Sequence, residues 1–322
     1  MNTRTLDYVI KRIGFSFLTV FVVLTFNFVL FRALPGSAVT DLSRVPNATP
    51  ALRHALAQQF GLAQPKWQQY FIYLKQLAHG NLGVSYINGL PVWHNLRADL
   101  FNTIPMVGLG TTLAIIFGIW SGVTAAWRWH RPADYLLTNS SIAFYSFPTQ
   151  WLGLMLVLLF GRFLPTTGMN NAFAVGGSTL SRLGDTLQHM VLPAIAVALT
   201  LYGQYTLVVR SAVLEVLGED YVLTARAKGL PARTILRRYV LRNALLPIVT
   251  LIALSIGYVV GGALLVETVF TWPGIGLAVY QSVLSRDYPM LQGAFLILTL
   301  SVVMLNLVAD LISLKLDPRV AE

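Results

Sequence analysis

The stretch from Thr103 to Ala126 reads TIPMVGLGTTLAIIFGIWSGVTAA and contains no charged side chain. A helix needs about 20 mostly apolar residues to cross the hydrocarbon core of a membrane. Inside lipid the backbone must satisfy its own hydrogen bonds, so a segment of this kind is predicted to be a transmembrane helix. Pro105 and the four glycines agree with this interpretation, because membrane helices tolerate both residue types.

Five further segments meet the same criterion. The six predicted spans are approximately residues 13–31, 103–126, 137–160, 189–209, 247–266 and 291–313. The first has about 19 apolar residues, longer than the apolar region of a signal peptide, and is predicted to be an uncleaved helix. Pro148 is predicted to kink the third, either for packing alone or for function. The predicted fold class is an all-α polytopic membrane protein with six transmembrane helices.

The composition agrees with a membrane protein. Of 322 residues, 55% are hydrophobic and only 11% are charged, and the mean hydropathy is +0.64. A soluble domain carries about a quarter charged residues, so lipid must cover much of this surface. The net charge of +10 does not indicate nucleic acid, because the basic residues lie in short stretches between apolar runs. The absence of cysteine and the scattered histidines argue against a metal site, and no cofactor is expected in this chain.

The basic residues also predict the orientation of the chain. With a cytoplasmic N-terminus, the inner segments 1–12, 127–136, 210–246 and 314–322 hold 14 of the 23 basic residues in about 68 positions. The outer segments then hold the other nine in about 121 positions. Both termini are therefore predicted to be cytoplasmic.

Two long segments between spans divide the chain into three predicted parts. Residues 1–32 form the cytoplasmic N-terminus and first span, residues 33–102 an extracytoplasmic loop domain, and residues 103–322 the core with an inner loop at 210–246. Amphipathic patterns at 52–60 and 67–77, followed by Gly80, Gly83 and Gly89, predict a small helical cap with turns. This cap is either a folded connector or a docking surface for an external partner.

The inner loop predicts two helices joined by a sharp elbow. Gly229 suits a left-handed C-terminal cap, and Pro231 suits the start of the next helix. In the second helix Ile235, Leu236, Tyr239 and Val240 recur at helical spacing, while arginines occupy the other faces. Such a helix either lies at the membrane interface with its arginines near lipid phosphates or inserts its apolar face into a groove of a partner.

At this loop the sequence resembles a known family. The run from Asp220 to Leu230, followed by Arg242 to Pro247, is similar to the EAA loop of ABC importer permeases, and most of all to the first (B-type) permease of the dipeptide, oligopeptide and nickel group. Leu223, Thr224 and Ala225 stand where the general pattern has Glu-Ala-Ala, and Gly229 matches its glycine.

Motifs in the same order as in that family extend the resemblance over nearly the whole chain. The matching segments are Leu34 to Gly36, Gly80 to Ser85, Asn102-Thr103, Glu267 to Gly276, Asn306-Leu307, Asp310 and Asp317 to Arg319. Ser37 and Ala38 depart from the family pattern, which has Asp and Pro there.

The resemblance implies six helices of the type I importer kind and a role as the transmembrane permease subunit of an ATP-driven importer in the bacterial inner membrane. The loop would couple to cytoplasmic ATPases through four residues, namely Ala225, Lys228, Gly229 and Leu230. The chain contains no Gly-Lys-Ser or Gly-Lys-Thr, so ATP and Mg²⁺ would be bound by partners and the chain itself would not be an enzyme. The implied partners are a second related permease, two ATPase subunits, an external substrate-binding protein and membrane lipid.

Several polar and aromatic residues near the spans are further candidates. An outer gate or a contact with the binding protein would involve Glu267, Phe270, Trp272 and Pro273. Glu267 either braces a turn or senses substrate, and Asp310 either pairs with a cation such as Lys315 or acts in transport. Asn27 and Asn306 could hydrogen-bond between helices.

The expected substrate is a di- or oligopeptide, with nickel chelates, glutathione and oligosaccharides as alternatives within the same family. An ion-coupled transporter would need acidic residues near mid-membrane, and the predicted spans have almost none there. A membrane-embedded hydrolase or transferase would need a cluster of reactive side chains at a membrane face, and the sequence shows no such cluster.

Overall fold

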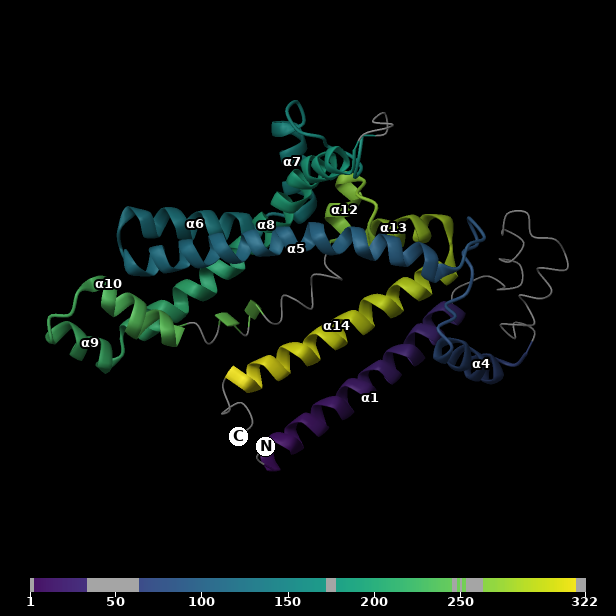
Figure 1. Cartoon of the computed structure of the whole chain (residues 1–322), viewed down its shortest axis with the longest axis horizontal. Helices are drawn as coiled ribbons and strands as arrows, with labels where there is room; N and C mark the ends of the chain where they lie inside the picture. Colours follow the sequence, from purple (N-terminus) through teal and green to yellow (C-terminus); the bar gives the residue numbers. More distant parts are fainter. Residues whose placement is uncertain are drawn as a thin grey trace. The chain divides into compact units, whose positions relative to one another are not determined.

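The computed structural model describes residues 3–33, 64–171, 178–244, 248–249, 251–252 and 263–316 (Figure 1). In these ranges every regular element is a helix, and the one β-bridge, between Val84 and Pro91, is isolated. The predicted all-α class is confirmed. The chain divides into two compact units: unit 1 comprises residues 1–103 and 273–307, and unit 2 comprises residues 104–272 and 308–322.

Four helices in the described part of the chain are long and apolar enough to cross a membrane. They are α1 (Thr3–Ala33), α5 (Val92–Trp127), α8 (Thr179–Leu217) and α14 (Tyr288–Leu316). These helices contain the first, second, fourth and sixth predicted spans. The helices α5 and α8 begin well before those spans. Hydropathy identifies only the apolar part of a helix that suits lipid, and it does not detect the more polar helical turns that precede it.

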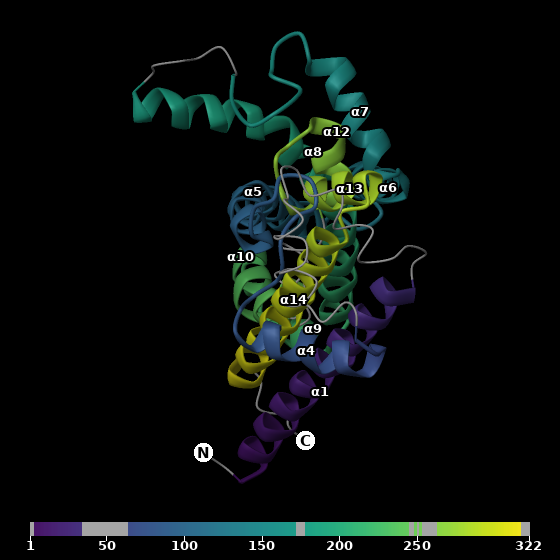
Figure 2. The same ribbon diagram turned by 90° about the vertical axis from the view of Figure 1, so that its right-hand side faces the viewer.

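The third predicted span is two helices, α6 (Pro132–Ser146) and α7 (Thr149–Phe160), and the helix direction bends by 107° between them. Figure 2 shows α7 turned away from α6. Phe147 precedes a proline and has the extended backbone that such a residue favours, with φ −76° and ψ 136°. Pro148 therefore lies where the kink was predicted, and the bend is a complete interruption of the helix.

Most of the fifth predicted span, residues 247–266, lies outside the described residues. Residues 248–249 and 251–252 are helical, and α12 (Leu264–Phe270) covers the end of the segment. The fifth span therefore stays a prediction.

Unit 1 contains α1, α4 (Lys66–Ala78), α13 (Ile275–Ser285) and most of α14, and α1 contacts both α4 and α14. The Thr25 hydroxyl lies 2.7 Å from the Tyr70 hydroxyl of α4, and the Asn27 amide donates to the Gln292 carbonyl of α14 at 3.0 Å. Asn27 is buried, so the helix bridge predicted for it is confirmed. The helix α4 also confirms the amphipathic pattern at 67–77, whereas the pattern at 52–60 lies outside the described residues.

Unit 2 is built around the close approach of α5 to α8. A Cβ on Gly122 would lie 2.7 Å from the Thr206 carbonyl oxygen and 2.7 Å from the Val209 Cβ. Beside this contact, the Ser121 and Thr206 hydroxyls are 2.7 Å apart and buried. Small residues allow such an approach between membrane helices, and a buried hydroxyl pair holds it. The sequence TIPMVGLGTTLAIIFGIWSGVTAA therefore supplies both a membrane span and a packing surface.

Candidate functional site

The elbow consists of α9 (Asp220–Ala227), residues 228–231, α10 (Ala232–Thr234) and the π-helix η2 (Ile235–Val240). Gly229 has φ +71°, and its N–H donates to the Arg226 carbonyl at 2.9 Å. The N–H of Leu230 donates to the Ala225 carbonyl at 3.3 Å. These two bonds form a Schellman cap, which fixes the end of α9 and the direction of the chain after it. The left-handed cap predicted at Gly229 is confirmed.

The four predicted coupling residues share this elbow but differ in burial. Lys228 and Gly229 are exposed, Leu230 is half-buried, and Ala225 is only 2% exposed. A Cβ on Gly229 would meet no other atom within 4 Å. The tip of the elbow, Lys228 to Leu230, is therefore the part that another molecule can reach, whereas the Ala225 side chain packs inside this chain.

A hydrophobic cluster, here named the elbow cluster, attaches the elbow to the ends of α5 and α8. Its buried members are Ala126 of α5, Val209, Ala212 and Val213 of α8, and the elbow-side residues Val222, Ala225, Ile235, Val240, Ala244 and Ile248. Burial of this apolar surface stabilises a fixed angle between α8 and α9. The elbow is therefore packed against the ends of α5 and α8 and is not a free loop.

The second arm of the elbow has the predicted two faces. Ile235 and Val240 are buried and Leu236 and Tyr239 are half-buried, which confirms the predicted apolar stripe. The opposite side carries exposed cations at Arg233, Arg237, Arg238 and Arg242. Ile235 and Val240 are five residues apart, a spacing that a π-helix places on one face more nearly than an α-helix does.

The candidates for an outer gate are largely inside the chain. Glu267 and Trp272 are each 0% exposed and Phe270 is 1% exposed, whereas Pro273 is half-buried. The Phe270 carbonyl accepts from the Gly168 N–H at 2.9 Å, and the Glu267 carbonyl accepts from the Trp272 N–H at 2.9 Å. This burial supports structural bracing, the first of the two roles considered for Glu267.

The two polar candidates of the last helix, Asn306 and Asp310, are half-buried in α14. The Lys315 side chain lies outside the described part of the structure. The ion pair expected for Asp310 therefore stays a prediction.

Two buried carboxylates were not singled out from the sequence. Asp134, at the start of α6, is 2% exposed and pairs with Arg210 of α8 at 2.7 Å. Asp287, just before α14, is also 2% exposed and accepts a hydrogen bond from the Ser85 hydroxyl. Both lie at the edge of a predicted span, where a charged residue is usually interpreted as a marker of topology. For Asp134 the sequence offered one signal of a structural role: it is an acidic residue inside the basic inner segment 127–136.

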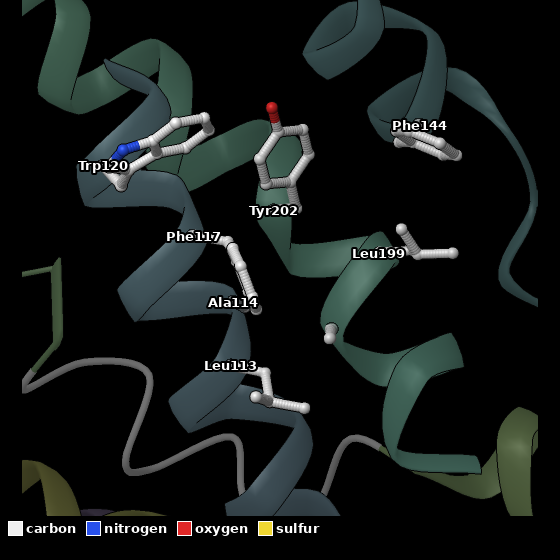
Figure 3. Close-up of a pocket in the computed structure, with 8 residues that line it drawn as sticks. Leu113, Ala114, Phe117, Trp120, Phe144, Leu199 and Tyr202 are labelled. Atoms are coloured by element: carbon white, nitrogen blue, oxygen red, sulfur yellow. The ribbon is translucent and has the colours of Figure 1, made fainter. Parts of the chain in front are cut away.

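An apolar hollow of about 230 Å³ lies between α5, α6 and α8 (Figure 3). Its lining comes from three predicted spans and consists of Leu113, Ala114, Phe117, Trp120, Phe144, Ala198, Leu199 and Tyr202. In the described part of the chain, no three His, Cys, Asp or Glu side chains are placed to hold a metal ion. The features that stand out in the described residues are the elbow with its hydrophobic cluster and this apolar hollow.

Comparison with known proteins gives full-length similarities. Residues 114–322 match the family described as the inner membrane component of binding-protein-dependent transport systems. The chain is 34% identical to a di/tripeptide transport system permease protein of Pseudomonas aeruginosa (strain UCBPP-PA14), with 98% of each chain covered. It is 34% identical to an oligopeptide transport system permease protein of Bacillus subtilis (strain 168), covering 97% of this chain and 98% of the relative. It is 33% identical to a glutathione transport system permease protein of Escherichia coli O6:H1, covering 98% and 99%.

Proposed function

Because this chain belongs to the family of inner membrane components of binding-protein-dependent transport systems, we propose that it is the permease subunit of an ATP-driven importer of di- or oligopeptides. The observation that carries the proposal is the elbow, a capped helix pair with an exposed tip, in a chain similar over its full length to peptide permeases. The chain forms half of the translocation path, and a second, related permease forms the other half.

In this proposal two ATPase subunits lie on the cytoplasmic side, and one of them docks on the elbow of this chain. Lys228, Gly229 and Leu230 touch an ATPase, while Ala225 holds α9 in the elbow cluster. ATP and Mg²⁺ are bound by the ATPase subunits, and closure of their pair moves the elbow. The elbow cluster supports this assignment. A helix bundle that switches between two conformations can be driven from the ATPase only through a contact that is rigidly attached to its helices.

Both termini are cytoplasmic in this proposal, and the segment at 33–102 faces an external substrate-binding protein. The described part of that segment supports a docking role, since Trp67 and Phe71 of α4 are 63% and 62% exposed. Large exposed aromatic side chains are enriched at the centres of protein interfaces. The binding protein selects the substrate and delivers it to the permease pair.

Uptake in proteoliposomes tests the proposal. The chain is reconstituted with its partner subunits, and entry of a labelled dipeptide is measured with and without ATP. We expect uptake that requires ATP and persists when a protonophore removes the proton gradient. Uptake that follows the proton gradient without ATP would indicate an ion-coupled transporter.

Competition assigns the substrate class. An excess of unlabelled tripeptide is expected to compete with the labelled dipeptide. If the complex takes up labelled glutathione or a nickel chelate with ATP but not the labelled dipeptide, the transporter class stands and the di- or oligopeptide assignment fails.

A further inference from the structure

The Asp134 carboxylate accepts four hydrogen bonds at the point where three parts of unit 2 meet. Its Oδ1 accepts from Arg210 Nε at 2.7 Å and from the Thr138 hydroxyl at 3.1 Å. Its Oδ2 accepts from Arg210 Nη2 at 3.0 Å and from the His130 N–H at 3.1 Å. Asp134 is 2% exposed, and both carboxylate oxygens have their partners inside the chain.

The four bonds join the turn after α5, the first turn of α6, and α8. His130 lies in that turn and has φ +59°, in the left-handed region that non-glycine residues rarely adopt. Arg210 meets the carboxylate with two nitrogens of its planar guanidinium, a geometry that a lysine cannot reproduce. We name this arrangement, Asp134 with Arg210, Thr138 and the His130 N–H, the α6–α8 clamp.

The clamp lies between the elbow and the interrupted third span, α6 with α7, which is here named the broken span. In the described residues the elbow cluster contains members of α5 and α8 but none of α6. Arg210 follows Val209, a cluster member, in the chain. Movement of the elbow can therefore reach α6 through α8 or through the turn that follows α5, and the clamp bonds α6 to both.

Beyond the clamp, α6 connects to α7 and, through α7, to α12. Its far end meets α7 at the 107° bend. The helix α7 in turn packs on α12, where a Cβ on Gly153 would lie 3.1 Å from Val269. The helix α7 also packs directly on α8, through the buried cluster that joins Leu156 to Leu192. A loose joint at the clamp would therefore let the start of α6 lag behind α8 and change the angle at which α6 meets α7.

We propose that Asp134 is a positioning residue for transport: through Arg210 it makes α6 and α8 move as one body, so that displacement of the elbow reaches the broken span. This rests on the proposed ATP-driven import. The clamp touches neither ATP nor substrate. Its loss separates ATP hydrolysis from uptake and leaves hydrolysis itself in place.

A graded series of variants in the reconstituted complex tests this. Thr138→Val removes one of the four bonds, Arg210→Lys keeps the charge but loses the paired geometry, and Asp134→Asn removes the charge. Uptake of labelled dipeptide and ATP hydrolysis are measured on the same vesicles. We expect uptake per ATP to fall in that order, by roughly tenfold for Asp134→Asn, within the range of ordinary coupling between sites.

Two controls separate positioning from general instability. Asp134→Glu keeps a carboxylate and is expected to restore part of the ratio. Asp7→Asn removes another paired carboxylate, one whose pair with Lys11 at 3.0 Å is exposed, and is expected to leave the ratio unchanged. If Asp134→Asn fails to assemble, Thr138→Val and Arg210→Lys decide the question.

The outcomes are distinct. If uptake per ATP stays the same across the series, either because both rates are unchanged or because they fall in equal proportion, the clamp has no role in coupling. If the unaltered complex shows no ATP-dependent uptake, the proposed function fails and not the clamp alone.

Discussion

The backbone N–H of Leu230 donates to the carbonyl of Ala225 across 3.3 Å and closes the end of α9 against the start of the next helix. That bond depends on the residue between them, Gly229, whose φ of +71° turns the chain. For an L-residue with a Cβ, this left-handed conformation costs about 1–2 kcal/mol. The neighbourhood is otherwise open, so a substitution there tests backbone conformation and contact with a partner, not packing within this chain.

We expect Gly229→Ala to reduce uptake per ATP and Gly229→Val to reduce it further, because both strain the cap and add bulk at the exposed tip. A penalty of one to two kcal/mol changes an equilibrium between docked and undocked elbows by roughly 5- to 30-fold. The measurement is uptake against ATP hydrolysis in reconstituted complexes. Gly218→Ala is the matched control, since Gly218 lies at the other end of α9 with an ordinary φ of −81°. Normal transport by Gly229→Val would show that Gly229 is not a coupling position.

The orientation of the elbow can be checked with single cysteines, because the natural chain contains none. Lys228 and His79 are both exposed, and they lie on opposite sides of the membrane in the proposed topology. In intact cells a membrane-impermeant thiol reagent should label His79→Cys and leave Lys228→Cys unlabelled until the cells are broken. The reverse pattern would place the elbow outside and remove the basis for ATPase docking there.

A second buried carboxylate is expected to hold the segment after α4. Asp287 accepts from the Ser85 hydroxyl at 2.5 Å and from the Tyr86 N–H at 3.1 Å. Hydrogen bonds to a buried charge contribute about 1.5–3 kcal/mol each. Asp287→Asn should therefore lower the apparent melting temperature in detergent and speed proteolysis within residues 80–91.

The exposed carboxylate of Asp7 again offers the control for that change. Asp7→Asn should leave both the melting temperature and the proteolysis rate near those of the natural chain, because exposed ion pairs contribute little. Equal sensitivity of the two variants would show that the Asp287 contacts do not hold this segment.

The sequence pattern predicted those features of the fold that are determined by one or two neighbouring residues. Gly229 and Pro231 indicated the elbow because left-handed caps and helix starts are properties of single residues. Pro148 located the break in the third span for the same reason, since proline removes a donor and restricts its predecessor. The size of that bend, 107°, depends on how α7 packs and was not predicted.

Pairings between distant residues could not be predicted in this way. Asp134 and Arg210 are 76 residues apart, and each alone is an ordinary charge at the edge of a span. Ser85 and Asp287 are 202 residues apart. Burial was also beyond the sequence pattern: Ala225 and Glu267 belong to recognisable motifs, yet whether a motif residue faces a partner or the core depends on the packing around it.

The packing of α5 on α8 yields the sharpest test of the fold, because α5 offers a matched pair of glycines. A Cβ on Gly122 would lie 2.7 Å from the backbone oxygen of Thr206, which cannot move without shifting α8. A Cβ on Gly108, in the same helix, would meet nothing within 4 Å.

Forcing a methyl group into a packed contact costs about 1–3 kcal/mol. We therefore expect Gly122→Ala to lower the apparent melting temperature and the amount of folded protein in the membrane, while Gly108→Ala, with the same change in helix propensity, leaves both unchanged or slightly raised. Equal behaviour of the two variants would mean that α5 and α8 do not approach each other as closely as the structure places them.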